Sequence, residues 1–348
     1  MKILLTGAAG FIGAAVADRL RDAGDEVVGV DLLIPAAHPA DATTAPGTHR
    51  VDIRDAAALL PLLRGADVVC HQAAMVGAGV TVADLPSYAS HNDLGTAVLL
   101  AAMHEAGVGR LVFASSMVVY GEGRYACPAH GPQSPGPRRR EALDGGDFEN
   151  HCTTCGRALD WLSVAEGTGL DPRSSYAASK VATEHYVAAW ARQAPGAAVA
   201  LRYHNVYGPG MPRDTPYSGV AALFRSAIEQ GRPPEVFEDG GQMRDFVHVG
   251  DVARANLLAL RRVMADPPDS YAAYNVCSGE PVPIGRVAEL VARGTGSGLT
   301  PRVTGRYRLG DVRHVVASPE LARTELGFAA QVRPDEGLPG FATAPLRG

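Results

Sequence analysis

The sequence predicts an α/β fold, a doubly wound parallel sheet of the Rossmann type with a smaller C-terminal lobe. Short apolar runs of strand length alternate with helical stretches through the first part of the chain. A glycine-rich turn also joins the first predicted strand to the first predicted helix. The 348 residues are 46% hydrophobic and 20% charged, which is enough for about two domains with a real core.

The predicted elements follow one another as strand, helix, strand. Lys2–Thr6 is the first strand, a helix follows Gly13, and a second strand covers Glu26–Val30 and ends at Asp31. Later strands are expected at Asp67–Cys70, Arg110–Ala114 and Ala198–Arg202, and helices at Ala56–Leu63, Leu94–Ala106 and Tyr176–Ala191. Strands separated by helices favour parallel pairing.

Composition excludes several classes of protein. A net charge of −5 argues against a nucleic-acid surface, and no apolar run is long enough to span a bilayer. Glycines interrupt the apolar N-terminus, so we expect no signal peptide there. Five cysteines, an odd number, indicate a reduced cytoplasmic protein and not a disulfide scaffold.

The turn Gly7-Ala-Ala-Gly10-Phe-Ile-Gly13 has the residues of a dinucleotide-binding loop. Glycines there permit a tight turn and a close approach of the backbone to a pyrophosphate at the helix N-terminus. Asp31, at the end of the second strand, is placed to accept hydrogen bonds from both ribose hydroxyls of an adenosine. The carboxylate would repel a 2'-phosphate, so we expect NAD and not NADP.

Tyr176 and Lys180 stand four residues apart and therefore share one face of the predicted helix. Lysine occurs elsewhere only at Lys2, which under a bias toward arginine suggests a site that needs an ammonium group. We expect Lys180 to lower the pKa of the Tyr176 phenol, so that the phenol can exchange a proton with an alcohol. Ser116, after a predicted strand, could bind the same oxygen.

Together these motifs resemble the extended short-chain dehydrogenase/reductase family, in its branch acting on nucleotide sugars. GAAGFIG, FASSMVVYG, YAASK, RYHNVYGPG and RDFVHVGDVA match in order. The resemblance implies catalytic roles for Ser116, Tyr176 and Lys180. It implies cofactor contacts from Gly7, Gly10, Phe11, Ile12, Gly13, Asp31, Asp52, Ile53, Ala73, Ala74, Asn92, Tyr176 and Lys180.

The same resemblance divides the chain and suggests where a sugar nucleotide binds. Residues 1–205 would form the NAD-binding domain, with 245–280 returning to it and 122–172 inserted in it, and 206–244 with 281–348 would form the substrate lobe. Substrate contacts are implied for Ser116, Asn205, Arg244 and Arg308, and guanidinium groups suit a diphosphate.

Three reactions share this machinery: 4-epimerisation, 4,6-dehydration and keto reduction. The family's dehydratases carry Asp-Glu directly after the position of Ser116, where this chain has Met117 and Val118, so dehydration is disfavoured. NAD favours a 4-epimerase over an NAD(P)H-dependent 4-ketoreductase, which stays an alternative. A catalytically silent NAD-binding regulator is the alternative from another class.

The insertion contains two pairs of metal ligands, Cys127 with His130 and Cys152 with Cys155. Four such ligands would close a tetrahedral structural zinc site. His151 could replace His130, and free thiols in a loop are the plainer alternative. GEGRYACPAHG and HCTTCG also resemble a bacterial subgroup described as dTDP-L-rhamnose 4-epimerases.

The family resemblance finally implies a homodimer. The helix that carries Tyr176 and Lys180 would pair with the helix at 92–106 across a two-fold axis, where Ala101, Ala102 and Ala106 would allow a close approach. The expected partner besides a second copy of the chain is a dTDP- or UDP-linked sugar, and neither nucleic acid nor membrane is expected.

Overall fold

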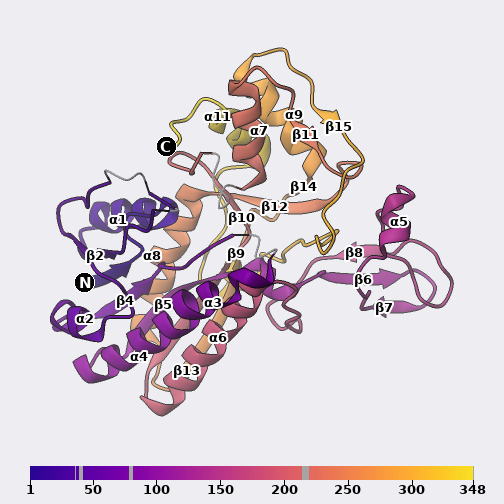
Figure 1. Ribbon diagram of the computed structural model, residues 1–348. Helices are drawn as coiled ribbons and strands as arrows, with labels where there is room; N and C mark the ends of the chain where they lie inside the picture. The colour runs from indigo at the N-terminus through magenta and orange to yellow at the C-terminus, as the bar shows by residue number, and fades with distance from the viewer. Residues whose placement is uncertain (36, 39–41, 78–80, 214–218, 348) are drawn as a thin grey trace.

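Seven parallel strands form the central sheet (Figure 1), in the order β13-β9-β5-β4-β1-β2-β3. The computed structural model describes residues 1–347 except 36, 39–41, 78–80 and 214–218. The strands are β1 (Lys2–Thr6), β2 (Glu26–Asp31), β3 (Thr48–Arg50), β4 (Val68–His71), β5 (Arg110–Ser116), β9 (Ala197–Tyr203) and β13 (Ser270–Val276). The strand order reverses between β1 and β4, and a ligand crevice forms at such a switch point.

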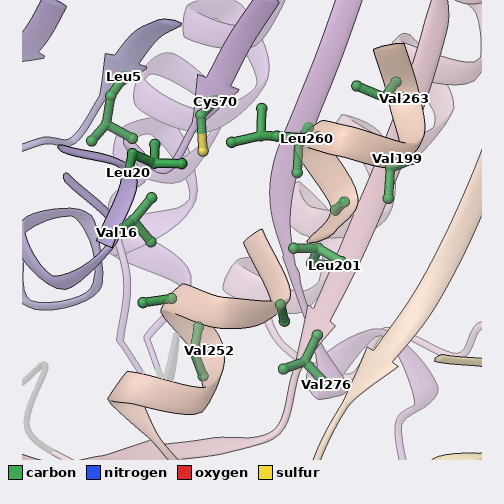
Figure 2. Packing of buried hydrophobic residues seen from close by; sticks show 14 of the residues in the cluster. Leu5, Val16, Leu20, Cys70, Val199, Leu201, Val252, Leu260, Val263 and Val276 are labelled. Atoms are coloured by element: carbon green, nitrogen blue, oxygen red, sulfur yellow. The ribbon is translucent and has the colours of Figure 1, made fainter. Parts of the chain in front are cut away.

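Helices cover both faces of this sheet, as a doubly wound fold requires. On one face lie α1 (Phe11–Asp22) and α8 (Val249–Ala265), and Figure 2 shows Leu20 of α1 beside Leu5 of the sheet, with Leu260 of α8 nearer to Cys70. On the other face lie α2 (Ala56–Leu63), α4 (Gly95–Ala106) and α6 (Ser175–Gln193). Both faces of the strands are therefore buried, which explains their continuous apolar runs.

Single residues explain where α6 begins and where α4 ends. The hydroxyl of Ser174 accepts a hydrogen bond from the backbone of Ala177 and caps α6. The helix α4 continues a turn made by η1 (Val82–Asp84), α3 (Leu85–Tyr88) and the π-helical segment η2 (Ala89–Leu94). It ends at Gly107, whose φ of 76° is the left-handed conformation that glycine adopts most easily.

The C-terminal lobe contains two small sheets and three helices. One sheet joins β10 (Asn205–Tyr207), β12 (Met243–His248) and β14 (Pro281–Pro283), and the other joins β11 (Glu235–Val236) and β15 (Arg302–Val303). The helices are α7 (Val220–Glu229), α9 (Ile284–Thr295) and α11 (Pro334–Phe341). A core separate from those of the central sheet holds them together.

One part of the expected lobe belongs elsewhere. Helix α10 (Glu320–Glu325) lies within 281–348, yet it packs against β13. The buried side chains of Ala322, Leu326 and Phe328 join the hydrophobic core on the α1 and α8 face of the central sheet. Burial of these apolar groups thus returns a second segment to the nucleotide-binding half of the molecule.

The insertion is a small folded module that projects from the body of the protein in Figure 1. Strands β6 (Arg124–Cys127), β7 (Gly131–Gln133) and β8 (Asp160–Leu162) form an antiparallel sheet in the order β7-β6-β8, beside α5 (Arg140–Asp144). Its hydrophobic core consists of Tyr125, Cys127, Cys152, Leu159 and part of Trp161. Two of these residues are cysteines, so few apolar groups hold the module together.

Among the described residues, no helix has the length and apolar character that crossing a membrane requires. None of the five cysteines, all of which lie in the described part of the chain, forms a disulfide.

Candidate active site

A cavity of about 1030 Å³ lies between the central sheet and the C-terminal lobe. It brings together residues from the whole length of the chain. The predicted site residues that line it are Gly7, Gly10, Phe11, Ile12, Gly13, Asp31, Asp52, Ile53, Ala73, Ala74, Ser116, Tyr176, Asn205, Arg244 and Arg308. Asn92 and Lys180 were also predicted, and they lie behind this wall.

The glycine loop leaves no room for side chains. A Cβ atom on Gly7, whose φ is +67°, would lie 2.6 Å from the backbone nitrogen of Ala73, and one on Gly13 would lie 1.9 Å from the carbonyl oxygen of Gly7. Helix α1 begins just beyond Gly10 and points its N-terminus at the cavity. Close backbone approach and a helix N-terminus together suit a pyrophosphate.

Asp31 ends β2 at the other end of this loop. Its carboxylate accepts hydrogen bonds from the backbone nitrogens of Ala9 (3.0 Å) and Leu33 (2.9 Å), which fix its orientation. His38 Nε2 lies 3.6 Å from the same carboxylate. The neighbouring cavity wall at Leu32 is apolar, as an adenosine requires. The glycine cradle and this carboxylate fit NAD.

Asp52 lines the cavity but already has a partner. Arg54 donates to it from Nη2 at 2.6 Å, and this hydrogen bond, opposed by burial, lowers the pKa of the Asp52 carboxyl group. The carboxylate is therefore charged and held in place at neutral pH.

Ser116, Tyr176 and Lys180 meet at the end of β5. Ser116 and Tyr176 both line the cavity, and the Ser116 hydroxyl acts to lower the pKa of the Tyr176 phenol, although 60 residues separate them. Lys180 Nζ lies 5.9 Å from the centre of the Tyr176 ring and donates to the carbonyl oxygen of Ala114 (2.9 Å). A hydroxyl and a phenol thus lie on the cavity wall, with an ammonium group close behind them.

The expected lowering of the phenol pKa is absent. Burial raises the pKa of Tyr176 to about 12, and the hydrogen bond with Ser116 offsets only part of that effect. Burial also lowers the pKa of Lys180 to about 8, against the charge of Glu184. Desolvation disfavours both the phenolate form of Tyr176 and the ammonium form of Lys180, and it is the largest influence on either pKa.

Asn92 supports the site from behind. Its side-chain oxygen accepts a hydrogen bond from the backbone of Met75 (2.7 Å), and its amide donates to Ser179 Oγ (2.9 Å) on α6. Asn92 lies in the π-helical segment η2, a rare conformation that often marks functional positions. The residue ties the cavity wall to the helix that carries Tyr176.

Besides Ser116, the predicted substrate residues that line the cavity come from the C-terminal part of the chain. Asn205 has a buried side-chain oxygen with no hydrogen-bond partner in the described part of the chain, which suits a ligand that donates one. Arg244 donates to the carbonyl oxygens of Val312 (2.7 Å) and Arg313 (2.8 Å). Arg308 is more exposed and pairs with Asp311 at 2.8 Å.

Sequence reasoning missed a buried ion pair under the catalytic helix. Glu184 binds Arg202 at 2.7 Å, and both side chains are almost fully buried. Glu184 stands four residues after Lys180, so the helical period could have placed it on the same face. Sequence reasoning also missed Arg347, which donates to the carbonyl oxygen of Ala9 in the glycine loop (2.6 Å). No sequence motif surrounds Arg347 that could have indicated this contact.

The four predicted metal ligands form one cluster in the insertion. The ligand atoms of Cys127, His130, Cys152 and Cys155 all lie within 4.8 Å of one another. His151, the alternative ligand, uses its ring nitrogens on Asp147 and the carbonyl oxygen of Gly156 instead. The structure therefore places His130, and not His151, with the cysteines.

Comparison with known proteins identifies the family of the chain. The profile of the NAD dependent epimerase/dehydratase family matches residues 3–144 and 161–277. The chain belongs to this family, and the predicted Rossmann fold and class of NAD-dependent nucleotide-sugar epimerases are confirmed. The unmatched interval lies inside the insertion.

Two proteins of similar sequence are 4-epimerases of nucleotide sugars. The chain is 32% identical to a dTDP-L-rhamnose 4-epimerase of Burkholderia thailandensis, over 97% of this chain and 93% of the relative. It is 31% identical to a UDP-glucose 4-epimerase of Streptomyces lividans, over 94% and 91% of the two chains.

Solved structures show the same architecture. The UDP-glucose 4-epimerase of Thermotoga maritima with UDP-glucose has a TM-score of 0.79 at 28% identity, covering 98% of this chain and 97% of that one. The UDP-glucose 4-epimerase of Thermus thermophilus in complex with NAD has a TM-score of 0.75 at 31% identity, with 98% of both chains covered.

Proposed function

We propose that this protein is an NAD-dependent 4-epimerase of a dTDP-6-deoxyhexose, of the dTDP-L-rhamnose type. The observation that carries the proposal is the convergence of Ser116 and Tyr176 with the glycine loop at one cavity whose far wall carries Arg244 and Arg308. A sugar anchored by its diphosphate at the far wall would present its ring to the phenol and the cofactor. The identity to a dTDP-L-rhamnose 4-epimerase supports the choice of sugar.

In the proposed mechanism, the Tyr176 oxygen removes the proton of the sugar C4 hydroxyl, and Ser116 donates a hydrogen bond to the same sugar oxygen. NAD, when bound, would supply the acceptor and donor for the hydride of sugar C4. Lys180 would hold a ribose of the cofactor, and its ammonium group, 5.9 Å from the centre of the Tyr176 ring, would stabilise negative charge on the phenol. The residues of the glycine loop and Asp31 retain the cofactor between the two transfers.

The residues beside Ser116 argue against dehydration. Removal of water across C5 and C6 needs an acid and a base at the sugar, yet Met117 and Val118 line the cavity with apolar side chains. They lie in the short helix η3 (Met117–Tyr120), directly after β5.

The deciding experiment is a turnover assay with dTDP-L-rhamnose and no added cofactor, with products separated by chromatography. An epimerase that retains NAD forms the C4 epimer without net change in absorbance at the NADH band. Consumption of one NADH or NADPH for each 4-keto sugar reduced would establish the ketoreductase instead. Binding of NAD without turnover of any dTDP- or UDP-sugar would favour the silent regulator.

We further propose one structural zinc ion in the insertion. Tetrahedral zinc with bonds of about 2.3 Å to sulfur and about 2.0 Å to nitrogen separates two sulfurs by about 3.8 Å and a sulfur from a nitrogen by about 3.5 Å. The sulfur atoms of Cys127 and Cys155 are 3.7 Å apart, and His130 Nδ1 lies 3.5 Å from the sulfurs of Cys127 and Cys152. The lack of disulfides suits the reducing cytoplasm, where we place the enzyme.

Elemental analysis after gel filtration tests this zinc site. We expect about one zinc per chain, because four protein ligands close the coordination shell. His130→Ala should lower the zinc content and the thermal stability, whereas the matched variant His151→Ala should leave the metal in place. Metal-free protein of full stability, or equal zinc in the two variants, would contradict the proposal.

We also propose a homodimer formed through α4 and α6. Large apolar side chains are exposed near these helices, with Leu94 at 52% and Tyr186 at 48%. Ala101 is exposed on α4, whereas Ala102 is buried inside the chain and cannot form part of the interface. Apolar side chains on two adjacent helices would be covered by a second copy of the same pair.

A further inference from the structure

The insertion contacts one wall of the active-site cavity, the loop of residues 306–314, here called the lobe loop. Arg306, Arg308, Asp311 and Val312 of this loop line the cavity. The backbone of the lobe loop also holds Arg244 in place, through the two carbonyl oxygens that accept its hydrogen bonds. The position of the loop therefore sets the position of three guanidinium groups at the substrate wall.

Arg313 connects the lobe loop to the insertion. Its side chain is 1% exposed and pairs with three carboxylates. Glu238 (2.8 Å) and Asp239 (2.8 Å) belong to the lobe, whereas Glu149 (2.5 Å) belongs to the insertion. The backbone nitrogen of Arg313 also donates to the buried carboxylate of Glu122, where the insertion begins (2.6 Å). A buried guanidinium group between two segments fixes both, because neither can withdraw its charge without a large desolvation cost.

Arg138 makes a second connection from the insertion. Its Nη2 donates to Glu238 (2.8 Å) and to the carbonyl oxygen of Asp311 (2.7 Å), while Nη1 donates to the carbonyl oxygen of Phe148 (3.0 Å). The side chain is 5% exposed. One insertion residue therefore holds the lobe loop, the lobe behind it and the insertion's own backbone.

His314 makes the third connection, close to the metal ligands. Its Nδ1 accepts a hydrogen bond from the backbone of Met243 (3.0 Å), so Nε2 carries the proton that Glu149 accepts (3.0 Å). The backbone nitrogen of His314 donates to the hydroxyl of Tyr125 (3.0 Å). Tyr125 is two residues before the ligand Cys127, and Glu149 is three residues before the ligand Cys152. The cysteine cluster thus ties together the two segments that hold the lobe loop.

We propose that the insertion is a positioning element for the diphosphate of the sugar nucleotide, with Arg138 and Glu149 as its positioning residues. The two side chains hold the lobe loop so that Arg244 and Arg308 face the cavity, and the cysteine cluster keeps their segments in register. This inference rests on the proposed function for the ligand it names. The contacts between the insertion and the loop stand independently of that ligand.

The position of the catalytic residues gives the inference a specific consequence. Ser116 and Tyr176 lie on β5 and α6, whereas the hydrogen bonds of Arg138 and Glu149 in the described part of the chain go to Phe148, Glu238, Asp311, Arg313 and His314. Arg313 keeps Glu238 and Asp239 as partners when Glu149 is neutralised, so the lobe itself stays folded. Loss of either positioning residue should therefore weaken substrate binding and spare the chemical step.

The test compares Arg138→Gln and Glu149→Gln with Arg139→Gln, whose side chain is exposed beside Arg138. Hydrogen exchange of peptides covering 306–314 should become faster in the first two variants and stay at the wild-type rate in the third. The KM for dTDP-L-rhamnose, and the Kd for dTDP by calorimetry, should rise about tenfold or more, equivalent to about 1.4 kcal/mol. The kcat at saturation and the retained NAD should stay near wild-type values.

Two results would overturn the inference on separate grounds. Unchanged hydrogen exchange in 306–314 would show that the insertion does not hold the lobe loop, whatever the substrate. Faster exchange with a loss in kcat at unchanged KM would show a general structural role in place of positioning. Wild-type protein that binds neither dTDP nor UDP would overturn the proposed function and the named ligand, while the exchange result would still report on the loop.

Discussion

Replacing Glu184 by glutamine should destabilise the protein far more than a surface change of the same kind. The Glu184 carboxylate is 3% exposed and accepts hydrogen bonds from Ser115 (2.5 Å), Tyr271 (3.1 Å) and two nitrogens of Arg202 (2.9 and 2.7 Å). Burial acts to raise the pKa of Glu184, but the hydrogen bond and charge of Arg202 lower it overall. The side chain is therefore an anion that balances a buried cation.

The magnitude follows from the partner left behind. Removing one member of a buried ion pair costs about 3–5 kcal/mol, since the other charge stays buried without compensation. Glutamine keeps the shape and some of the hydrogen bonds, so we expect about 3 kcal/mol from Glu184→Gln, at the lower end of that range. Urea unfolding measures the change. The exposed pair of Glu320 and Arg323 supplies the control, because Glu320→Gln should cost no more than about 1 kcal/mol.

The same substitution should change the pH dependence of turnover. Lys180 has a pKa of about 8, lowered by burial and raised by the charge of Glu184. Without that charge the pKa of Lys180 falls further, and the ammonium form is lost at lower pH. Because the proposed mechanism needs the ammonium form, the alkaline limb of kcat should move to lower pH. Stability equal to that of Glu320→Gln, or an alkaline limb that stays in place, would refute the reasoning.

Three further outcomes are expected. Tyr176→Phe should lower kcat by about 10² to 10⁴, the usual contribution of a positioned acid or base, with dTDP binding kept; near-normal turnover would remove the phenol from the mechanism. Calorimetric titration should show NAD binding well ahead of NADP, because Asp31 repels a 2'-phosphate, and equal affinities would contradict this reason. Sedimentation at micromolar concentration should give twice the chain mass of 36.3 kDa, and a single species at that mass would exclude the dimer.

The central sheet could be predicted because its signals are local. Each buried parallel strand is a short apolar run, and the runs at Arg110–Ala114 and Ala198–Arg202 lie inside β5 and β9. The glycine loop and the pair of Tyr176 and Lys180 are likewise short patterns with one chemical meaning. Ser116 could be placed near the glycine loop from one rule alone, that the carboxyl ends of parallel strands lie at the same edge of a sheet.

The features that sequence did not reveal depend on partners distant in the chain. The strands of β10, β14 and β15 are two or three residues long, too short for periodicity to show. The pairing of Glu184 with Arg202, and of Arg313 with Glu149, carries no sequence signal beyond the presence of charge. Such pairs exist because the fold buries both groups together, so they are properties of the tertiary structure.

Tyr176 shows that a sequence motif can identify an acid/base residue without predicting the pKa of that residue. The spacing places Lys180 on the face of the phenol, but the size of its effect depends on what else is buried there. In this fold the Lys180 ammonium points to the carbonyl oxygen of Ala114, and desolvation raises the pKa of the phenol to about 12. A positive charge arriving with the cofactor would act in the same low-dielectric site, where charges interact more strongly than in water. The motif therefore identifies the acid/base residue, whereas its pKa depends on every group buried around it.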